Sequence, residues 1–314
     1  MNLIFLGTPK FAIPALKALY ESKHSIAAVI TQPNREKDRK GNLLETPVKA
    51  FARKFGIPVF QFEKISEHID ELKTIDADIM ITCAYGQILS QNVLDLKKYG
   101  VINIHASLLP KYRGAAPVQW ALINGEQQTG ITIMQTAKGL DCGDIIYKIE
   151  TDIKNDENSN ELFERLSSLG AEAIITSLDM IVQGKSKKTP QNNNEATYFP
   201  MLKKQDGLLD FNKNSVTLYN QIRGMYSWPC AFTYLFGQLF KVWKSEIIDK
   251  DTKNKNAAKV LSADKNGITV ACKTGSINFL EVQLAGSKRM TVEEFLKGKK
   301  VPVGTVLGKI DGTC

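Results

Sequence analysis

The chain has 314 residues, a formal net charge of +8, 43% hydrophobic residues and 24% charged residues. These values are ordinary for a folded globular protein of roughly two domains, and they exclude a disordered or fibrous chain. No apolar run approaches the roughly 18 to 20 residues that cross a bilayer, so we expect no membrane partner. The five cysteines are dispersed without a C-x-x-C pair, which argues against a disulfide framework and predicts a cytoplasmic location.

The positive charge is concentrated in two places. Residues 209–314 hold 16 Lys and Arg against 9 Asp and Glu, and residues 35–54 hold seven against three. A solvated basic face is the ordinary explanation of such a surplus. A basic final third together with one basic loop instead favours a polyanionic partner, with nucleic acid as the first candidate.

The first 150 residues alternate short apolar runs with amphipathic stretches. Strands are predicted over 3–6, 26–30, 58–60, 79–82 and 101–104, and helices over 11–21, 47–55, 66–73 and 89–96. This alternation predicts an α/β fold with a doubly wound, mainly parallel, Rossmann-like sheet. Gly7 follows the first strand, but the G-x-G-x-x-G fingerprint is missing, which argues against a dinucleotide-dependent oxidoreductase.

A long helix is predicted over 159–183, and the polar run after it is typical of a linker. A short helix over 215–225 is then followed by strand-like runs at 232–236, 240–243, 259–261, 268–271, 277–282 and 304–307. Short strands at this spacing predict a small OB-like β-barrel. We therefore expect a first domain over 1–189, a linker over 190–207 and a basic β-barrel over 208–314.

The segment from Val101 onward contains the candidate chemistry. Alternation along the predicted strand puts Asn103 and His105 on one face at its C-terminal end, where open α/β sheets bind ligands. A lone histidine is more often a structural hydrogen-bonder, but the neighbouring Asn103 favours catalysis. His24 and His68 stand in polar contexts, where we expect exposure. We expect no metal, because the histidines and cysteines form no ligand constellation.

Three motifs occur together: Asn103-x-His105-x-Ser-Leu-Leu-Pro, then Arg113-Gly-Ala-Ala-Pro, then Gly-Leu-Asp141-x-Gly-Asp. The set resembles the 10-formyltetrahydrofolate-dependent formyltransferases, and within them the methionyl-tRNA formyltransferases, over nearly the whole chain. Asn103, His105 and Asp141 by themselves indicate only membership of the superfamily. The Gly-Ala-Ala-Pro motif and the basic C-terminal region single out the tRNA enzymes.

This resemblance implies transfer of the formyl group of 10-formyltetrahydrofolate, a cosubstrate, to the α-amino group of methionyl-initiator tRNA. It also implies the catalytic roles. Asn103 would donate to the oxyanion, and His105 would accept and return protons. Asp141 would fix the imidazole tautomer and favour its charged form.

The binding residues are likewise implied by the resemblance. Folate would be held by Ser107, Leu108, Leu109 and Pro110 and by Ala84, Tyr85, Gly86 and Gln87. The tRNA-facing loop corresponds to 34–45, with Arg39 as its key residue and Lys40 and Arg35 beside it. In the family that arginine is flanked by glycines, whereas here the flanks are Asp38 and Lys40, so the conformation of the loop stays open. We expect the chain to act as a monomer.

Other functions remain open at this point. Formyltransferases acting on amino sugar nucleotides share the Asn-His-Asp set and have a second domain, so they are the main alternative. The glycinamide ribonucleotide enzyme lacks a basic β-domain, and residues 209–314 argue against it. A non-catalytic RNA-binding protein on the same scaffold is a further alternative, which the presence of all three catalytic residues disfavours.

Overall fold

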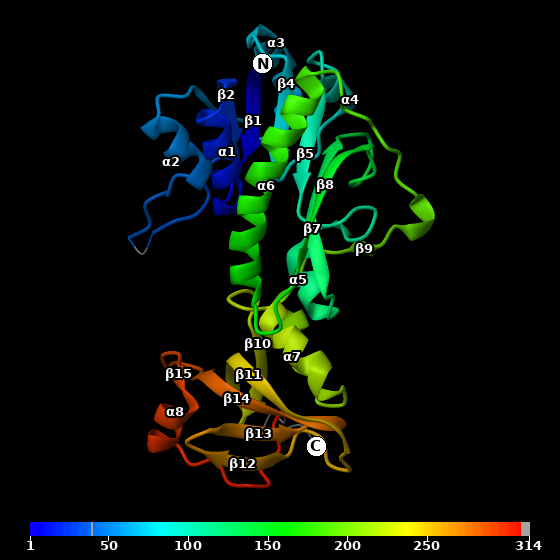
Figure 1. Cartoon of the computed structure of the whole chain (residues 1–314). Coiled ribbons are helices and arrows are strands. Elements are labelled where there is room, and N and C mark those ends of the chain that lie inside the picture. The colour runs from blue at the N-terminus through cyan, green and yellow to red at the C-terminus, as the bar shows by residue number, and fades with distance from the viewer. Residues whose placement is uncertain (39, 309–314) are drawn as a thin grey trace. The chain divides into compact units, whose positions relative to one another are not determined.

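The computed structural model describes residues 1–38 and 40–308 (Figure 1). The chain forms two compact units, and each is assembled from more than one segment. The first comprises Met1–Pro117, Gln128–Asp152 and Phe163–Phe199, and the second comprises Val118–Gln127, Ile153–Leu162 and the described chain from Pro200 onward. The segment 190–207, expected as a linker, therefore contributes residues to both units.

The first unit is built on a sheet with the strand order β3-β2-β1-β4-β5-β7-β8 (Figure 1). Its strands are β1 (Asn2–Gly7), β2 (Ser25–Thr31), β3 (Val59–Gln61), β4 (Ile79–Cys83), β5 (Val101–His105), β7 (Gln128–Gln135) and β8 (Ile145–Asp152). The strands from β3 to β5 pair in parallel, and β7 and β8 extend the sheet antiparallel. The chain thus starts at the centre and winds outward to both sides, as the doubly wound expectation requires.

The helices before residue 200 are α1 (Ile13–Tyr20), α2 (Pro47–Lys54), α3 (Ile69–Thr74), α4 (Gln91–Leu94), α5 (Pro117–Ile123) and α6 (Ser159–Val182). The described residues also form four short 3-10 turns: η1 (Lys10–Ala12), η2 (Ile65–Glu67), η3 (Asn193–Glu195) and η4 (Lys204–Gly207). Helix α2 begins where sequence rules predict: the Thr46 hydroxyl accepts from the Lys49 amide, and Pro47 occupies the first turn.

Two predicted helices are wrong in extent. The helix expected over 66–73 is divided into η2 and α3, because His68 takes a non-helical backbone conformation with φ of −118°. The helix expected over 89–96 shortens to α4, because the chain turns at Lys97–Gly100 to enter β5, with the Gly100 amide bonded to the Lys97 carbonyl.

The expected exposure is wrong for His24, whereas His68 keeps 34% of its side chain exposed. His24 has only 6% of its surface exposed, and its Nδ1 lies 3.4 Å from the N-terminal amine of Met1. The ring of His68 stacks on Phe62 with centroids 4.2 Å apart. Polar neighbours in sequence do not report the burial of His24, because packing partners come from distant segments.

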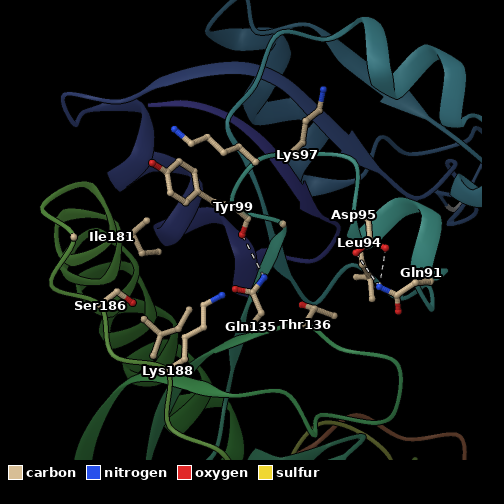
Figure 2. Close-up of a pocket in the computed structure, with 14 residues that line it drawn as sticks. Gln91, Leu94, Asp95, Lys97, Tyr99, Gln135, Thr136, Ile181, Ser186 and Lys188 are labelled. Carbon is tan, nitrogen blue, oxygen red and sulfur yellow. Dashed lines mark hydrogen bonds between the residues drawn. The ribbon is translucent and has the colours of Figure 1, made fainter.

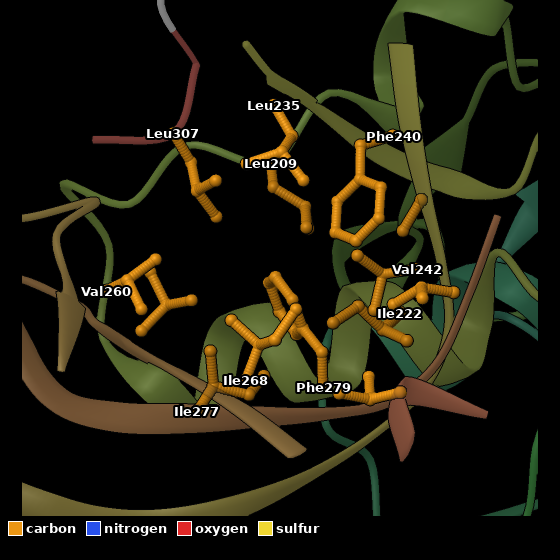
Figure 3. Packing of buried hydrophobic residues seen from close by; sticks show 14 of the residues in the cluster. Leu209, Ile222, Leu235, Phe240, Val242, Val260, Ile268, Ile277, Phe279 and Leu307 are labelled. Atoms are coloured by element: carbon orange, nitrogen blue, oxygen red, sulfur yellow. The ribbon is translucent and has the colours of Figure 1, made fainter. Parts of the chain in front are cut away.

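The second unit contains an antiparallel sheet with the order β10-β11-β14-β13-β12. These strands are β10 (Ala231–Leu235), β11 (Gln238–Lys253), β14 (Thr274–Leu284), β13 (Gly267–Ala271) and β12 (Val260–Asp264), and β15 (Met290–Thr291) pairs with β14. Figure 3 shows the core inside this sheet, where Phe240 and Val242 of β11 and Phe279 of β14 pack with Ile222 of α7 (Ser215–Gly224). The expected fold class is confirmed.

Two details of the second unit differ from the sequence prediction. Residues 304–307 form no strand, although Gly304 and Thr305 exchange backbone hydrogen bonds with Val260 of β12. Helix α8 (Val292–Gly298) is not anticipated, although Thr291 caps it by accepting from the Glu294 amide. Within residues 1–38 and 40–308, no helix combines the length and the apolar character needed to span a bilayer.

Candidate active site

The predicted catalytic residues meet at the carboxyl end of β5, in the first unit. Asn103 is half-buried and lies opposite Thr82 of β4 in the parallel register, while His105 lies opposite Thr132 of β7. Asp141 arrives on the loop between β7 and β8, and its Oδ1 lies 3.7 Å from Nδ1 of His105. Two segments distant in sequence, β5 and the loop after β7, therefore supply the three residues that the motifs single out.

His105 has 6% of its surface exposed, and both of its ring nitrogens have defined surroundings. Nε2 lies 2.9 Å from the backbone carbonyl of Tyr112. Since a carbonyl oxygen can only accept, Nε2 must be the protonated nitrogen, and the neutral ring presents a lone pair at Nδ1. The tautomer is therefore fixed by Tyr112 and not by Asp141 as expected, because 3.7 Å is too long for a hydrogen bond.

Asn103 is oriented by the neighbouring strand. The Thr82 hydroxyl donates to Oδ1 of Asn103 over 2.8 Å. With its oxygen occupied, the Asn103 amide presents its NH2 group as a donor at the strand end. Sequence reasoning missed Thr82, and the only available signal was its position at the same end of the adjacent predicted strand.

The Asp141 loop has an unusual backbone that other segments support. Asp141 has φ of +46°, in the left-handed region that costs energy for a residue with a side chain. Its Oδ2 accepts from the Gly114 amide over 2.8 Å. Two residues later, Gly143 packs against the backbone of Gln135. A Cβ at position 143 would lie 1.7 Å from the Gln135 carbonyl oxygen, so only glycine allows the two backbones to approach this closely.

A strap of residues 189–199 lies along β6 and the loop that carries Asp141, within the first unit. Thr189 bridges to Ile145, and β9 (Tyr198–Phe199) pairs in parallel with β6 (Arg113–Gly114). The Thr197 hydroxyl accepts from the Tyr112 amide over 2.8 Å, and the Phe199 ring stacks on Tyr112 at 4.7 Å. The sequence offers no signal for these contacts, because the strap is polar and lacks apolar periodicity.

The turn proposed for folate, Ser107–Pro110, lies directly after β5. Thr132 holds it: its hydroxyl donates to the Ser107 carbonyl over 2.6 Å and accepts from the Leu109 amide over 3.1 Å. Ser107 and Leu109 are buried, whereas Leu108 and Pro110 are half-exposed. Leu108 and Pro110 are therefore the members of the turn that can contact a flat ring.

The second expected folate segment, 84–87, follows β4 at the same edge of the sheet. Ala84 and Gly86 are exposed and have φ of +48° and +88°, so backbone groups are accessible there. Tyr85 is buried in the core, which raises the pKa of its phenol to about 12. The Gln87 amide is occupied, since its oxygen accepts from the Ile65 amide and its nitrogen donates to the Phe62 carbonyl.

The expected tRNA loop leaves the carboxyl end of β2, at the same edge of the sheet. Arg39 lies outside the described residues. Lys37 and Leu43 form an antiparallel bridge, and the Asp38 carboxylate accepts from the amides of Lys40 and Asn42. Hydrogen bonds from Asn42 lower the pKa of the Asp38 carboxyl. Arg35 is exposed and is paired with Glu63 at 2.8 Å.

A hollow of about 600 Å³ opens at the opposite end of the sheet, where the chain enters β5 (Figure 2). Lys97, Lys98, Tyr99 and Lys188 are among its lining residues, and the Gln135 side chain donates to the Tyr99 carbonyl over 3.3 Å. None of the described residues that the motifs single out lines this hollow. Among the described residues, no three His, Cys, Asp or Glu side chains are grouped so as to hold a metal.

Comparison with known proteins covers both units. Residues 1–178 match the formyl transferase family, and residues 201–300 match the formyl transferase C-terminal domain. The methionyl-tRNA formyltransferase of Acetivibrio thermocellus is 44% identical over 98% of this chain and 100% of its own length. That of Geotalea uraniireducens is 44% identical over 99% of both chains.

The chain belongs to the methionyl-tRNA formyltransferase family. The resemblance carried by the three motifs is thereby confirmed, as is the expectation that the chain is a formyltransferase.

Solved structures agree on the fold. A sugar 3N-formyl transferase, solved in the presence of dTDP and 5-N-formyl-THF, matches with a TM-score of 0.70 and 21% identity over 92% of this chain and 99% of its own. A methionyl-tRNA formyltransferase from Clostridium thermocellum matches with a TM-score of 0.58 and 18% identity, over 91% of this chain and 100% of its own. At such identities structural likeness shows the fold alone, and the full-length sequence relatives decide between the tRNA and sugar enzymes.

Proposed function

We propose that this chain transfers the formyl group of 10-formyltetrahydrofolate to the α-amino group of methionyl-initiator tRNA. The observation that carries the proposal is the meeting of Asn103, His105 and Asp141 at one strand end, in a chain 44% identical to full-length methionyl-tRNA formyltransferases. We further expect the enzyme to act as a monomer in the cytoplasm.

Formyl transfer begins when the neutral amine attacks the formyl carbon, which turns the carbonyl oxygen into an oxyanion. The Asn103 NH2 group is the donor available to that oxygen, because the Thr82 hydroxyl occupies Oδ1 of the same amide. A preoriented donor loses no energy in reorganising as the charge develops. Removing one such donor costs on the order of 3 kcal/mol of transition-state stabilisation in comparable sites.

Attack leaves a proton on the new ammonium nitrogen, and the departing folate nitrogen needs one. In the neutral tautomer set by Tyr112, Nδ1 of His105 can accept that proton and return it as the bond from carbon to the folate nitrogen breaks. Oδ1 of Asp141, 3.7 Å away, favours the imidazolium that forms between these steps. Nδ1 and Oδ1 also offer two adjacent acceptors to the ammonium group before it loses its proton.

The residues around the strand end fit a folate cosubstrate. Leu108 and Pro110 provide half-exposed apolar surface, and the backbone at Ala84 and Gly86 provides donors and acceptors for a pterin. We propose that these four residues contact the cosubstrate directly. Tyr85 and Gln87 act by holding the segment in place, since the Tyr85 ring packs in the core and the Gln87 amide is hydrogen-bonded within the protein.

For the tRNA we propose two contacts: the loop 34–45, with Arg39 and Lys40, and a face of the second unit. On that face the Arg289 guanidinium lies over the rings of Trp243 and Tyr226, at 4.8 and 5.3 Å, and Lys241 lies over Trp243. Cations interleaved with aromatic rings are typical of nucleic-acid surfaces. Counterion release makes such binding weaken steeply with salt.

The proposal is tested by offering the purified chain 10-formyltetrahydrofolate with three acceptors: methionyl-initiator tRNA, free methionine and an amino sugar nucleotide. We expect formylation of the tRNA-bound amine and only trace reaction with the other two. Faster transfer to the sugar nucleotide would overturn the proposal in favour of the sugar enzymes.

A further inference from the structure

Arg113 is an arginine buried without a carboxylate partner. It has 1% of its surface exposed, and within the described residues all the acceptors it contacts are neutral. Its Nε and Nη2 donate to Oε1 of Gln191 over 3.1 and 2.8 Å, Nη2 also donates to Asn193, and Nη1 donates to the Tyr198 hydroxyl. Burying a cation is costly unless its donors are satisfied, so this geometry calls for an explanation.

Gln191 connects Arg113 to the Asp141 loop. Because its oxygen accepts from the guanidinium, its NH2 group must face the other way. That NH2 group donates to the backbone carbonyls of Asp141 and Gly143, over 2.9 and 2.7 Å. One side chain from the strap thus fixes the loop on both sides of Cys142.

The same strand holds the other end of Asp141. The residue after Arg113, Gly114, donates its amide to the Asp141 carboxylate over 2.8 Å. The side chain of Asp141 is therefore held by Gly114, and its main chain is held by Gln191. A residue at φ of +46° needs such support to keep one conformation.

We propose that Gln191 is a positioning residue for Asp141, and that the buried charge of Arg113 serves to orient the Gln191 amide. We call this pair of residues the clamp. The inference rests on the proposed function, because it assumes that Asp141 acts in formyl transfer. The clamp keeps Oδ1 of Asp141 directed at Nδ1 of His105, where a small displacement weakens stabilisation of the imidazolium.

The decisive variant is Gln191→Glu. It keeps an acceptor for Arg113, now a charged one, but replaces both donors to the loop by an oxygen that repels the two carbonyls. We expect kcat to fall by roughly 10- to 100-fold, the range that small misplacements of a catalytic group produce. The KM for 10-formyltetrahydrofolate should stay within about threefold of the wild-type value, because the contacts that bind this cosubstrate in its ground state are unchanged. Thermal unfolding should show a folded protein.

Asn193→Ala is the matched control. It removes one acceptor from Arg113 and touches neither Asp141 nor Gly143, so kcat should change by less than about threefold. Gln191→Ala, which removes the same donors without adding charge, should reproduce the loss in kcat. If both Gln191 variants keep kcat within about threefold of wild type, the clamp is wrong.

A double variant separates positioning from general damage. In an Asp141→Asn background, Gln191→Glu should lower kcat little further, because its target is already gone. If the fold losses in kcat of the two single variants multiply in the double variant, the clamp is wrong, while the proposed function is unaffected. If Asp141→Asn alone leaves transfer unchanged, the proposed role of Asp141 fails, and the clamp fails with it.

Discussion

The hydroxyl of Thr82 donates a 2.8 Å hydrogen bond to Oδ1 of Asn103, across the parallel register of β4 and β5. The two residues are neighbours because the strand order places β4 beside β5, and both stand at the carboxyl edge of the sheet. The bond decides which end of the Asn103 amide is free. A donor is what a developing oxyanion needs.

Removing the Thr82 hydroxyl should therefore impair turnover while leaving the strand in place. For Thr82→Val we expect kcat to fall roughly 10-fold, and for Asn103→Ala roughly 100- to 1000-fold. Thr82→Ser keeps the hydroxyl and is the control, with kcat near wild type. Steady-state kinetics with saturating folate cosubstrate make the comparison. Equal kcat for the Val and Ser variants would show that the amide is oriented by something else.

His105 and Asp141 should each be required for turnover. For His105→Ala and for Asp141→Ala we expect kcat to fall on the order of 100-fold or more, since each change removes proton transfer or the charge that supports it. Binding of folate, measured by fluorescence titration, should change little. A variant with more than roughly a tenth of wild-type kcat would remove its residue from the catalytic set.

The structure explains which parts of the fold could be predicted from the sequence. The parallel strands β1, β2, β4 and β5 are buried on both faces and read as continuous apolar runs. Neither β7 nor β8 was among the predicted strands: β8 is mostly half-buried or exposed along its length, whereas β7 is buried and its apolar run was overlooked. Strand β11 continues beyond its predicted four residues through charged positions, because pairing with β14 supports it.

The candidate site likewise has residues that the sequence predicts and residues that it does not. Asn103, His105 and Asp141 could be named because they stand in a recognisable motif set. Their supports could not be named, because Thr82 and Gln191 reach the site through strand pairing and through a polar strap. The tautomer of His105 depends on the carbonyl of Tyr112, and a backbone oxygen has no signature in a sequence.

Stability should depend on pH through His24. Burial, followed by the nearby N-terminal ammonium, lowers the pKa of His24 in the folded chain. The unfolded chain therefore binds the proton more strongly, so the free energy of unfolding should fall as pH drops below about 6.5 and level off above it. His24→Gln should flatten this dependence in chemical denaturation between pH 5 and pH 7. An unchanged slope in His24→Gln would assign the dependence to other groups.

The salt dependence of tRNA binding should distinguish the contribution of the second-unit face from that of the sheet edge where His105 lies. Lys241→Ala and Arg289→Ala should weaken tRNA binding and make its logarithmic dependence on salt shallower, by about one unit for each phosphate that is no longer bound. Formyl transfer at saturating tRNA should persist in both variants.

Truncation of the second unit is a poor test, because Val118–Gln127 and Ile153–Leu162 belong to the second unit and would be left without their packing partners. Lys273→Ala, away from the aromatic rings, is the control, and an equal effect there would point to a diffuse charge effect.

The loop 34–45 carries Arg39 and Lys40. Asp38 accepts from the Lys40 amide and from both the amide and the side chain of Asn42. The loop leaves the carboxyl end of β2, at the edge of the sheet where His105 lies. An arginine there can bind phosphate or a base edge with two parallel hydrogen bonds, which lysine cannot reproduce.

We expect Arg39→Ala to raise the KM for initiator tRNA or to lower kcat by misplacing the amine, and Arg39→Lys to rescue only in part. Lys40→Ala should have a smaller effect, and the double variant the largest. Lys17→Ala is the matched control, because that exposed lysine lies on α1, outside the loop 34–45. If only Lys40→Ala impairs transfer, the critical cation is one position later. If the double variant stays within about twofold of wild type, the loop makes no productive contact and the second unit alone must hold the tRNA.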